Sequence, residues 1–268
     1  SCSTLAWALG YFGMPHILLR FMAIEDHNKL KLSRRIAVIW VVIAMGVAIL
    51  IGIIGNAMTK VGAVPLLEGS ASETIIVCIS DLLSKHGCLA AIVAGIVLSG
   101  ILAATMSTAD SQLLVSASSV AEDIFKGLLK KDADDKTVMN VSRITVLVVA
   151  VLAYIIAWNP NNTVMGLVSN AWAGLGAAFG PLVVMSLYWK KTNFPGAVAG
   201  IVTGALAVII WDYIPLVGGQ TLGKATGLYS LVVGFGLGLI AIIAVSLTTK
   251  APSEEMLQEF EDVKANRL

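Results

Sequence analysis

The stretch AGIVLSGILAATMSTADSQLLV, residues 94 to 115, decides the fold class of this chain. It begins as an apolar helix of the kind that crosses a bilayer. A cluster of polar residues then follows, consisting of Thr105, Ser107, Thr108, Asp110, Ser111 and Gln112. Hydrocarbon offers no water to hydroxyls or to a carboxylate, so we expect this cluster to face a cavity or an ion. Hydroxyl oxygens suit a small hard cation, and the stretch therefore favours ion-coupled transport.

The remainder of the chain has the composition of a polytopic membrane protein. Of its 268 residues, 57% are hydrophobic and 13% are charged, whereas soluble domains are nearer a quarter charged. The net charge of +1 gives no reason to expect nucleic-acid binding, because the charges are segregated into loops. The chain begins with Ser and enters a helix almost at once, so we expect a fragment whose N-terminal part is missing.

Apolar runs of roughly 20 residues, enough to cross a bilayer, predict seven spans. Their expected limits are 3–23, 36–57, 87–121, 138–158, 163–188, 195–213 and 225–248, with the polar cluster breaking the third. Residues 70–86 predict a short amphipathic helix between the second and third spans. Residues 1–248 thus form a transmembrane region, and residues 249–268 form a tail whose apolar face should lie on the membrane surface or on the transporter itself.

The basic residues give this arrangement an orientation. All but three of the 18 Lys and Arg residues fall on one side of the predicted membrane, the exceptions being Lys60, Lys85 and Lys224. Because Lys and Arg gather in cytoplasmic loops, we expect that side, and the C-terminal tail with it, to be cytoplasmic. Small residues that allow close helix packing recur in the last three spans, among them Ala173, Ala177, Gly196, Gly200, Gly204, Gly234, Gly236 and Gly238.

Ala104, Ser107 and Thr108 are the candidate cation ligands. Their i, i+3, i+4 spacing places them on one face of a helix. If that face meets a second, broken helix, the Ala104 carbonyl and the two hydroxyls converge and the partner helix supplies further carbonyls. The alternative is that both hydroxyls bond back to carbonyls of their own helix. Asp110 points to a different face, where it is either solvated, bonded to its own helix, or involved in handling the ion.

The first predicted span contains a candidate substrate site. Trp7 and Tyr11 share a helix face, and Gly10, Gly13 and Pro15 surround the second aromatic residue. Glycine and proline in a membrane helix mark a place where it can unwind and offer backbone groups to a ligand. The aromatic pair could pack a small apolar ring while the Tyr11 hydroxyl binds a polar group. Ordinary aromatic packing between helices is the alternative interpretation.

Three segments carry a family resemblance: GYFGMPHILLRFMA (10–23), ILAATMSTADSQLLVSASSVAEDIFK (101–126) and GLVSNAWAGLGAAFGPLVV (166–184). Together they resemble the solute:sodium symporter family, with the closest likeness to its bacterial sodium/proline symporters. The likeness extends from residue 1 to about residue 248. It implies an all-α polytopic membrane protein with a LeuT-type inverted repeat. This chain would be the second half of that repeat plus two trailing helices, with the N-terminal half absent.

The resemblance also implies roles for individual residues. A sodium ion would be held by the Ala104 carbonyl and the Ser107 and Thr108 hydroxyls, with its remaining ligands in the missing half. Trp7, Tyr11 and Pro15 would contact the substrate, L-proline, and Trp172 would belong to the outer gate. The implied function is sodium-coupled symport of L-proline into the cell, by alternating access, across the plasma (inner) membrane.

Other functions stay open at this point. The solute could be another small carboxylate, such as a different amino acid or pantothenate, or the chain could be a transporter-like sensor domain. An intramembrane enzyme is disfavoured because no Ser/His pair, paired carboxylates at one depth or HExxH motif is found. The partners expected are L-proline, sodium, the lipid bilayer and the missing N-terminal half, with no nucleic acid.

Overall fold

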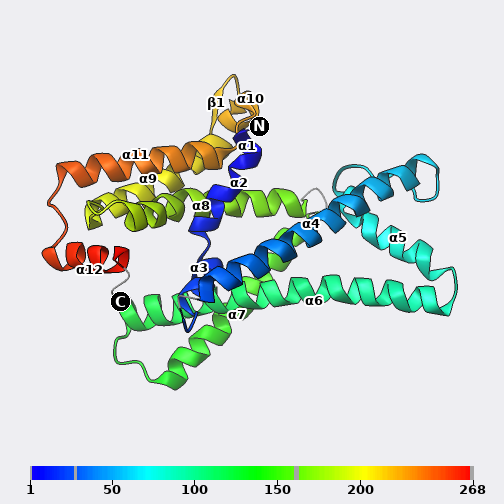
Figure 1. Ribbon diagram of the computed structural model, residues 1–268, viewed down its shortest axis with the longest axis horizontal. Helices are drawn as coiled ribbons and strands as arrows, with labels where there is room; N and C mark the ends of the chain where they lie inside the picture. Colours follow the sequence, from blue (N-terminus) through cyan, green and yellow to red (C-terminus); the bar gives the residue numbers. More distant parts are fainter. Residues whose placement is uncertain (1, 27–28, 160–162, 266–268) are drawn as a thin grey trace. The chain divides into compact units, whose positions relative to one another are not determined.

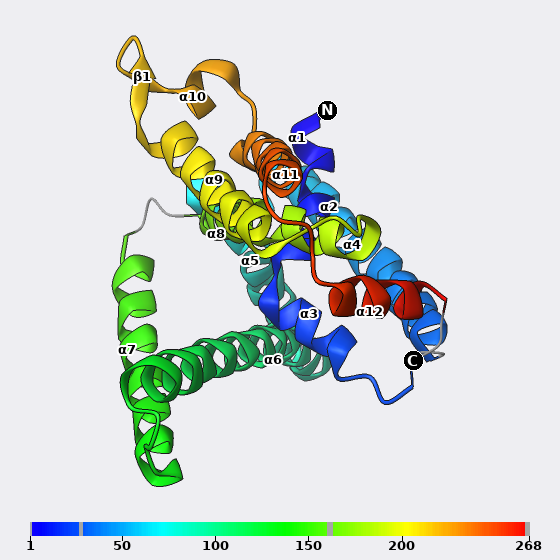
Figure 2. The same ribbon diagram turned by 90° about the vertical axis from the view of Figure 1, so that its left-hand side faces the viewer.

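The computed structural model describes residues 2–26, 29–159 and 163–265, and the chain divides into two compact units (Figures 1 and 2). One unit joins Ser1–Met22 to Met165–Leu268, and the other comprises Ala23–Val164. The first residues of the chain therefore fold with its last hundred or so, although the whole second unit separates them in the sequence. This pairing brings the predicted substrate helix into contact with the last three long helices.

Most of the described residues are helical. The unit formed by the two ends contains α1 Cys2–Leu5, α2 Trp7–Gly10, the 3-10 helix η1 Tyr11–Gly13, α3 Pro15–Met22, α8 Val164–Tyr188, α9 Phe194–Tyr213, α10 Leu222–Thr226, α11 Ser230–Thr248 and α12 Glu254–Lys264. The other unit contains α4 Leu30–Lys60, the 3-10 helix η3 Gly69–Thr74, α5 Ile75–Ser84, α6 Cys88–Ser118, a π-helix η4 Ser119–Leu129 and α7 Asp135–Ala157.

A two-stranded antiparallel hairpin, β1 Pro215–Val217 and β2 Gln220–Thr221, follows α9. Gly218 and Gly219 form its turn with φ values of 55° and 79°. Both lie in the left-handed region, which glycine adopts without a steric cost and which a tight hairpin turn requires. This hairpin was not among the elements predicted from the sequence.

Six helices of the described chain are long and apolar enough to cross a membrane: α4, α6 with the π-helix that continues it, α7, α8, α9 and α11. The prediction of an all-α polytopic membrane protein is therefore confirmed. Each of the last six predicted spans falls on one of these helices. The first predicted span, residues 3–23, is instead divided into α1, α2, η1 and α3, and whether this segment also crosses the bilayer stays a prediction.

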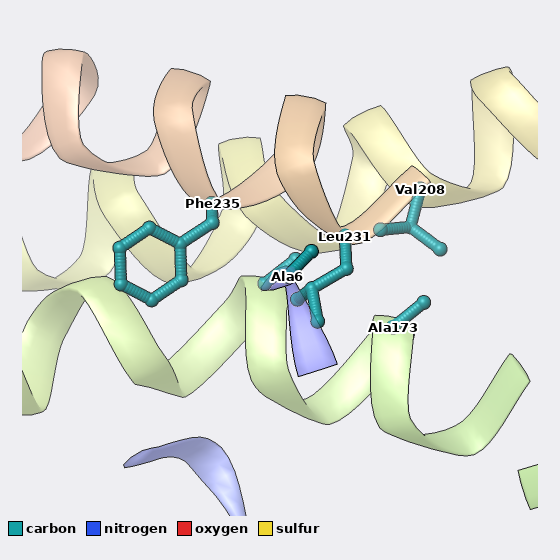
Figure 3. Close-up of a cluster of buried hydrophobic side chains, with 6 residues drawn as sticks. Ala6, Ala173, Val208, Leu231 and Phe235 are labelled. Atoms are coloured by element: carbon teal, nitrogen blue, oxygen red, sulfur yellow. The ribbon is translucent and has the colours of Figure 1, made fainter. Parts of the chain in front are cut away.

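The core of the unit formed by the two chain ends lies where α8, α9 and α11 meet the start of the chain (Figure 3). Ala6, Ala173, Val208, Leu231 and Phe235 are buried there, and Ala177 completes the cluster. Leu231 is fully buried. Burial of large apolar side chains against alanines is how helices that share a lipid solvent gain packing contacts.

Close backbone approach holds α9 and α11 side by side (Figures 1 and 2). A Cβ atom on Gly200 would lie 2.3 Å from the Ile242 side chain, and one on Gly204 would lie 2.0 Å from the Ala177 carbonyl oxygen of α8. A Cβ atom on Gly234 of α11 would likewise lie 2.7 Å from the Ala177 methyl group. The predicted packing role of these glycines is confirmed. Gly236 differs, because open space surrounds its position among the described residues.

A buried asparagine joins the start of α9 to the end of α11. Asn193 is 5% exposed, and its Oδ1 accepts a hydrogen bond of 2.9 Å from the Gly196 backbone N–H. Its Nδ2 donates to the Thr249 hydroxyl at 2.8 Å and to the Lys250 carbonyl at 2.7 Å. One side chain therefore caps α9 and satisfies carbonyl and hydroxyl groups left open where α11 ends.

The C-terminal helix α12 lies against the same unit. Glu261 forms an ion pair of 3.2 Å with Lys190, which follows α8. The predicted apolar face of α12 consists of Met256, Phe260 and Val263. These side chains line a cavity of roughly 690 Å³ together with residues at the end of α8 and the start of α9. Of the two predicted positions for this tail, the one on the transporter itself is thus observed.

The second unit is built from α4 to α7. The predicted amphipathic helix is present as η3 and α5, and Ile75 of α5 fits against Gly55 of α4, where a Cβ would lie 2.4 Å away. Ala121 and Val138 are buried between the π-helix and α7. Most apolar side chains of α4, α6 and α7 are exposed, and these three helices are among those long and apolar enough to cross a membrane.

Candidate functional site

The predicted substrate helix is broken, as its glycines and proline indicate. The α-helix α2 ends at Gly10, a single 3-10 turn covers Tyr11–Gly13, and Met14 is extended with φ −91° and ψ 109°. Pro15 then starts α3, where its missing N–H and fixed φ cost nothing. The prediction of an unwound region between Gly10 and Pro15 is confirmed.

This broken segment packs tightly on α8. A Cβ atom added to Gly176 would lie 2.7 Å from the Gly10 Cα atom, and one added to Gly13 would lie 2.4 Å from the Leu175 carbonyl oxygen. Only residues without a side chain allow two backbones to approach so closely. The glycines that interrupt the helix are therefore also the ones that fix its position on α8.

Four aromatic side chains gather at this contact. The Trp7 indole stacks on Trp172 of α8 with ring centroids 5.8 Å apart, and Tyr11 meets the same Trp172 edge to face at 4.9 Å. The fourth ring belongs to Tyr229, which stacks on Trp7 at 6.2 Å. The Trp172 indole N–H also donates a hydrogen bond of 3.0 Å to the Trp7 carbonyl. Trp7 and Tyr11 thus share one face, as predicted, and that face meets Trp172.

Tyr229 is not among the site residues predicted from the sequence. This residue directly precedes α11, and its hydroxyl donates a hydrogen bond of 2.6 Å to the Ser169 carbonyl of α8. Its distance from Trp7 along the chain left no local pattern that could associate the two. A tyrosine just before an apolar helix was the only signal, and that signal is also typical of a residue at the membrane interface.

The candidate cation ligands lie on α6, which runs without interruption from Cys88 to Ser118. The expected break at the polar cluster is therefore wrong. Three hydroxyls of the cluster fit inside a regular helix because they donate to carbonyls one turn earlier: Thr105 to Ile101, Thr108 to Ala104 and Ser111 to Ser107. Serine and threonine have this option in any helix. The helix changes character only after Ser118, where the π-helix begins.

Ala104 and Thr108 are brought together by this helix, with the Thr108 hydroxyl 3.2 Å from the Ala104 carbonyl oxygen. Ser107 lies one turn from Ala104 on the same face, and all three residues are exposed. A hydroxyl that donates its hydrogen keeps two lone pairs, so Thr108 can still turn an oxygen toward a cation. For Thr108 the structure therefore shows the alternative interpretation, a hydroxyl bonded back to a carbonyl of its own helix.

The two sets of predicted site residues belong to different units. Trp7, Tyr11 and Pro15 lie in the unit formed by the chain ends, and Ala104, Ser107 and Thr108 lie in the other. Within the first set, the aromatic cluster includes Trp7 and Tyr11, while Pro15 starts the helix beyond the break. Among residues 2–26, 29–159 and 163–265, no group of three or more His, Cys, Asp or Glu side chains could hold a metal ion.

The family model described as the sodium:solute symporter family matches residues 1–204. The chain belongs to the sodium:solute symporter family. The match includes the broken segment, the polar cluster of α6 and the whole of α8, so every predicted site residue of this symporter-family chain lies inside it.

Curated relatives of this sodium:solute symporter chain carry related names. It is 41% identical over 260 residues to the high-affinity proline transporter PutP of Bacillus subtilis, which covers 97% of the chain and 52% of that relative. It is 43% identical over 258 residues to the osmoregulated proline transporter OpuE of the same organism, covering 96% of the chain and 50% of OpuE. The sodium/proline symporter of Escherichia coli is 41% identical over 267 residues, with 98% and 50% covered.

The chain spans about half the length of the curated relatives that it matches. No solved structure matches it.

Proposed function

We propose that the protein of which this chain forms part is a sodium-coupled symporter that carries L-proline into the cell. The identity of 41% to 43% with relatives named as proline transporters or sodium/proline symporters, over nearly the whole chain, carries this proposal. Membership of the sodium:solute symporter family supports sodium as the coupling ion. The transport cycle needs no bond chemistry.

The broken segment supports a role in binding the solute. Trp7 and Tyr11 would offer aromatic faces to the pyrrolidine ring of proline, and the Tyr11 hydroxyl a hydrogen bond to its carboxylate or amine. Tyr11 is 54% exposed, so its ring is accessible for such a contact. Pro15 would shape the site because a proline favours an extended backbone in the residue before it, here Met14, while its own fixed φ suits the start of α3.

The polar face of α6 supports a role in binding sodium. Ala104, Ser107 and Thr108 would supply one carbonyl and two hydroxyl oxygens, and further ligands would come from a part of the protein outside this chain. Sodium binding would favour the outward-open state and order the solute site, because a ligand shifts a conformational equilibrium only by its differential affinity for the two states. The membrane potential adds about 2.3 kcal/mol per charge for each 100 mV.

The architecture proposed for the whole protein is a LeuT-type inverted repeat that works by alternating access. In this arrangement the chain up to α8 would form the second half of the repeat, and α9 and α11 would be the two trailing helices. The C-terminal tail with α12 would be cytoplasmic, since the basic residues gather on that side of the predicted spans.

Uptake of labelled proline into membrane vesicles tests the function directly. The full-length protein should accumulate proline when an inward sodium gradient is imposed and should fail to do so with a potassium gradient of equal size. Excess unlabelled pantothenate should not compete, whereas excess unlabelled proline should. Sodium-driven uptake of pantothenate in place of proline would support the alternative solute, and accumulation that ignores the sodium gradient would overturn the coupling.

A pair of matched double variants tests the cation face of α6. Ser107→Ala with Thr108→Ala should abolish the sodium dependence of proline uptake, because two of the proposed ligands are removed. Thr105→Ala with Ser111→Ala provides the control, since both hydroxyls donate to the same helix at 2.9 Å but neither is a proposed ligand. Sodium activation that is equal in the two double variants would refute the site.

A further inference from the structure

We propose that Tyr229 is a positioning residue for the solute site, and that it holds the Trp7 indole in the orientation that receives proline. The inference rests on the proposed function and adds a residue that lies outside the broken segment. Tyr229 precedes α11, one of the two long apolar helices that follow α8, and neither of these two helices contributes a predicted site residue. A role for Tyr229 would give this trailing helix a direct connection to the solute.

The first observation is the stacking of the two rings. The Tyr229 and Trp7 ring planes are only 17° apart, with centroids at 6.2 Å. Trp7 also lies nearly parallel to Trp172, at 28° and 5.8 Å. An indole that packs against two other aromatic rings has far fewer accessible rotamers than a free one. Removal of Tyr229 should release one of these two constraints.

The second observation is that Tyr229 is itself fixed at both ends. Its hydroxyl donates to the Ser169 carbonyl at 2.6 Å, which joins it to α8. Its backbone N–H donates to the Ser3 hydroxyl at 3.3 Å. This bond joins Tyr229 to α1, which directly precedes the helix α2 that carries Trp7. Trp7 is therefore held by a ring whose own position is determined by two separate helices.

The third observation is that α9 holds the residues on either side of Tyr229. The Trp211 indole N–H donates to the Leu228 carbonyl at 3.0 Å. The hydroxyl of Ser230, which is 1% exposed, donates to the Asp212 carboxylate. The turn that presents Tyr229 is thus bonded before and after the ring. This arrangement is what a residue that positions another side chain requires.

Transport kinetics of the full-length protein test the assignment. Tyr229→Leu should raise the half-saturating proline concentration by roughly two- to tenfold, the range expected for loss of one aromatic pair. The maximal rate and the half-saturating sodium concentration should stay within about twofold. Tyr229→Phe should show a smaller rise, because the stack remains and only the bond to Ser169 is lost. Tyr213→Leu is the matched control, since Tyr213 is 63% exposed at the end of α9.

A double-mutant cycle separates positioning from a general loss of structure. If Tyr229 acts through Trp7, Tyr229→Leu should have no further effect in a Trp7→Ala background. Effects of Tyr229→Leu and Trp7→Ala that multiply would overturn the proposal, and so would wild-type affinity in Tyr229→Leu. If Tyr229→Leu does not reach the membrane, the same cycle is read with Tyr229→Phe.

A measurement that does not depend on transport tests the role of Tyr229 separately from the proposed function. Fluorine NMR of protein labelled with 5-fluorotryptophan, with the Trp7 signal assigned by its loss in Trp7→Phe, reports on the indole directly. In Tyr229→Leu the Trp7 signal should shift or broaden, while that of the exposed Trp40 should stay in place. If the full-length wild-type protein transports no proline, only the proposed function is contradicted. An unchanged Trp7 signal in Tyr229→Leu would contradict the positioning role of Tyr229.

Discussion

At the scale of single residues, the broken segment shows how a break in a helix and close packing on a neighbouring helix can depend on the same amino acids. Gly10 and Gly13 end the helix and also allow it to lie directly on the backbone of α8. A Cβ on Gly10 would lie 2.1 Å from the Trp172 indole nitrogen, so Trp172 occupies space that any larger residue would take. The aromatic cluster therefore depends on glycine as much as on its own rings.

Trp7→Ala tests the solute role of this cluster. The variant should raise the half-saturating proline concentration by roughly tenfold, which corresponds to loss of about 1.4 kcal/mol of aromatic contact. Insertion into the membrane should be unchanged, because the buried residues of the core cluster remain. Trp40→Ala is the control, since Trp40 of α4 is 69% exposed. Equal proline affinity in the two variants would contradict the assignment of Trp7.

At the scale of the elements, small residues set which helices meet. The approach of α9 to α8 and α11 depends on Gly200, Gly204 and Gly234, where a neighbouring backbone or apolar side chain occupies the space that a Cβ would take. In lipid no hydrophobic force brings helices together, so such close packing has to supply the contact energy. The capping of α9 by Asn193 adds hydrogen bonds at one end of the same pair.

Gly204→Ala and Gly236→Ala form a matched pair that tests this packing. A Cβ on Gly204 would lie 2.0 Å from a backbone oxygen of α8, so α9 has to move, and overpacking of this kind costs about 1–3 kcal/mol. Gly236 has open space around it among the described residues, and alanine there should be neutral or slightly stabilising. Thermal unfolding in detergent should therefore show a lower midpoint for Gly204→Ala only. Equal midpoints would show that α9 can shift without cost.

At the scale of the whole molecule, the chain consists of two units whose helices carry different proposed ligands. The unit formed by the chain ends holds the aromatic cluster and the trailing helices, and the unit Ala23–Val164 holds the polar face of α6. Coupling of sodium to solute would have to link these two units, because neither contains both sets of residues. The acidic helix α12 remains attached to the first unit through Glu261 and Lys190.

Membrane topology gives a test at this scale. Cys88, which is exposed at the start of α6, should react with a membrane-impermeant maleimide in intact cells when every other cysteine is replaced by serine. In a protein without native cysteines, Ala251→Cys, placed just before α12, should react only after the cells are permeabilised. These outcomes follow from the predicted cytoplasmic position of the basic loops. Labelling of both positions from the same side would rule out this arrangement.

Features that depend on local chemistry could be predicted from the amino acids alone. Hydropathy located the last six spans, because a bilayer imposes the same length and polarity on every helix that crosses it. Gly10, Gly13 and Pro15 predicted the break in the first segment, because glycine and proline act on the backbone at their own positions. The spacing of Trp7 and Tyr11 likewise predicted their shared face, which α8 meets.

Which groups those local features contact depends on how the helices pack. The polar cluster of α6 could either interrupt its helix or satisfy its hydroxyls within it, and the bond from Thr108 to Ala104 shows that a continuous helix is possible. The contact between Tyr229 and Trp7 left no pattern in the sequence, because it joins the start of the chain to a turn beyond α10. Local preferences fix where a helix begins and breaks, but stacking and hydrogen bonding between distant residues depend on how the helices pack.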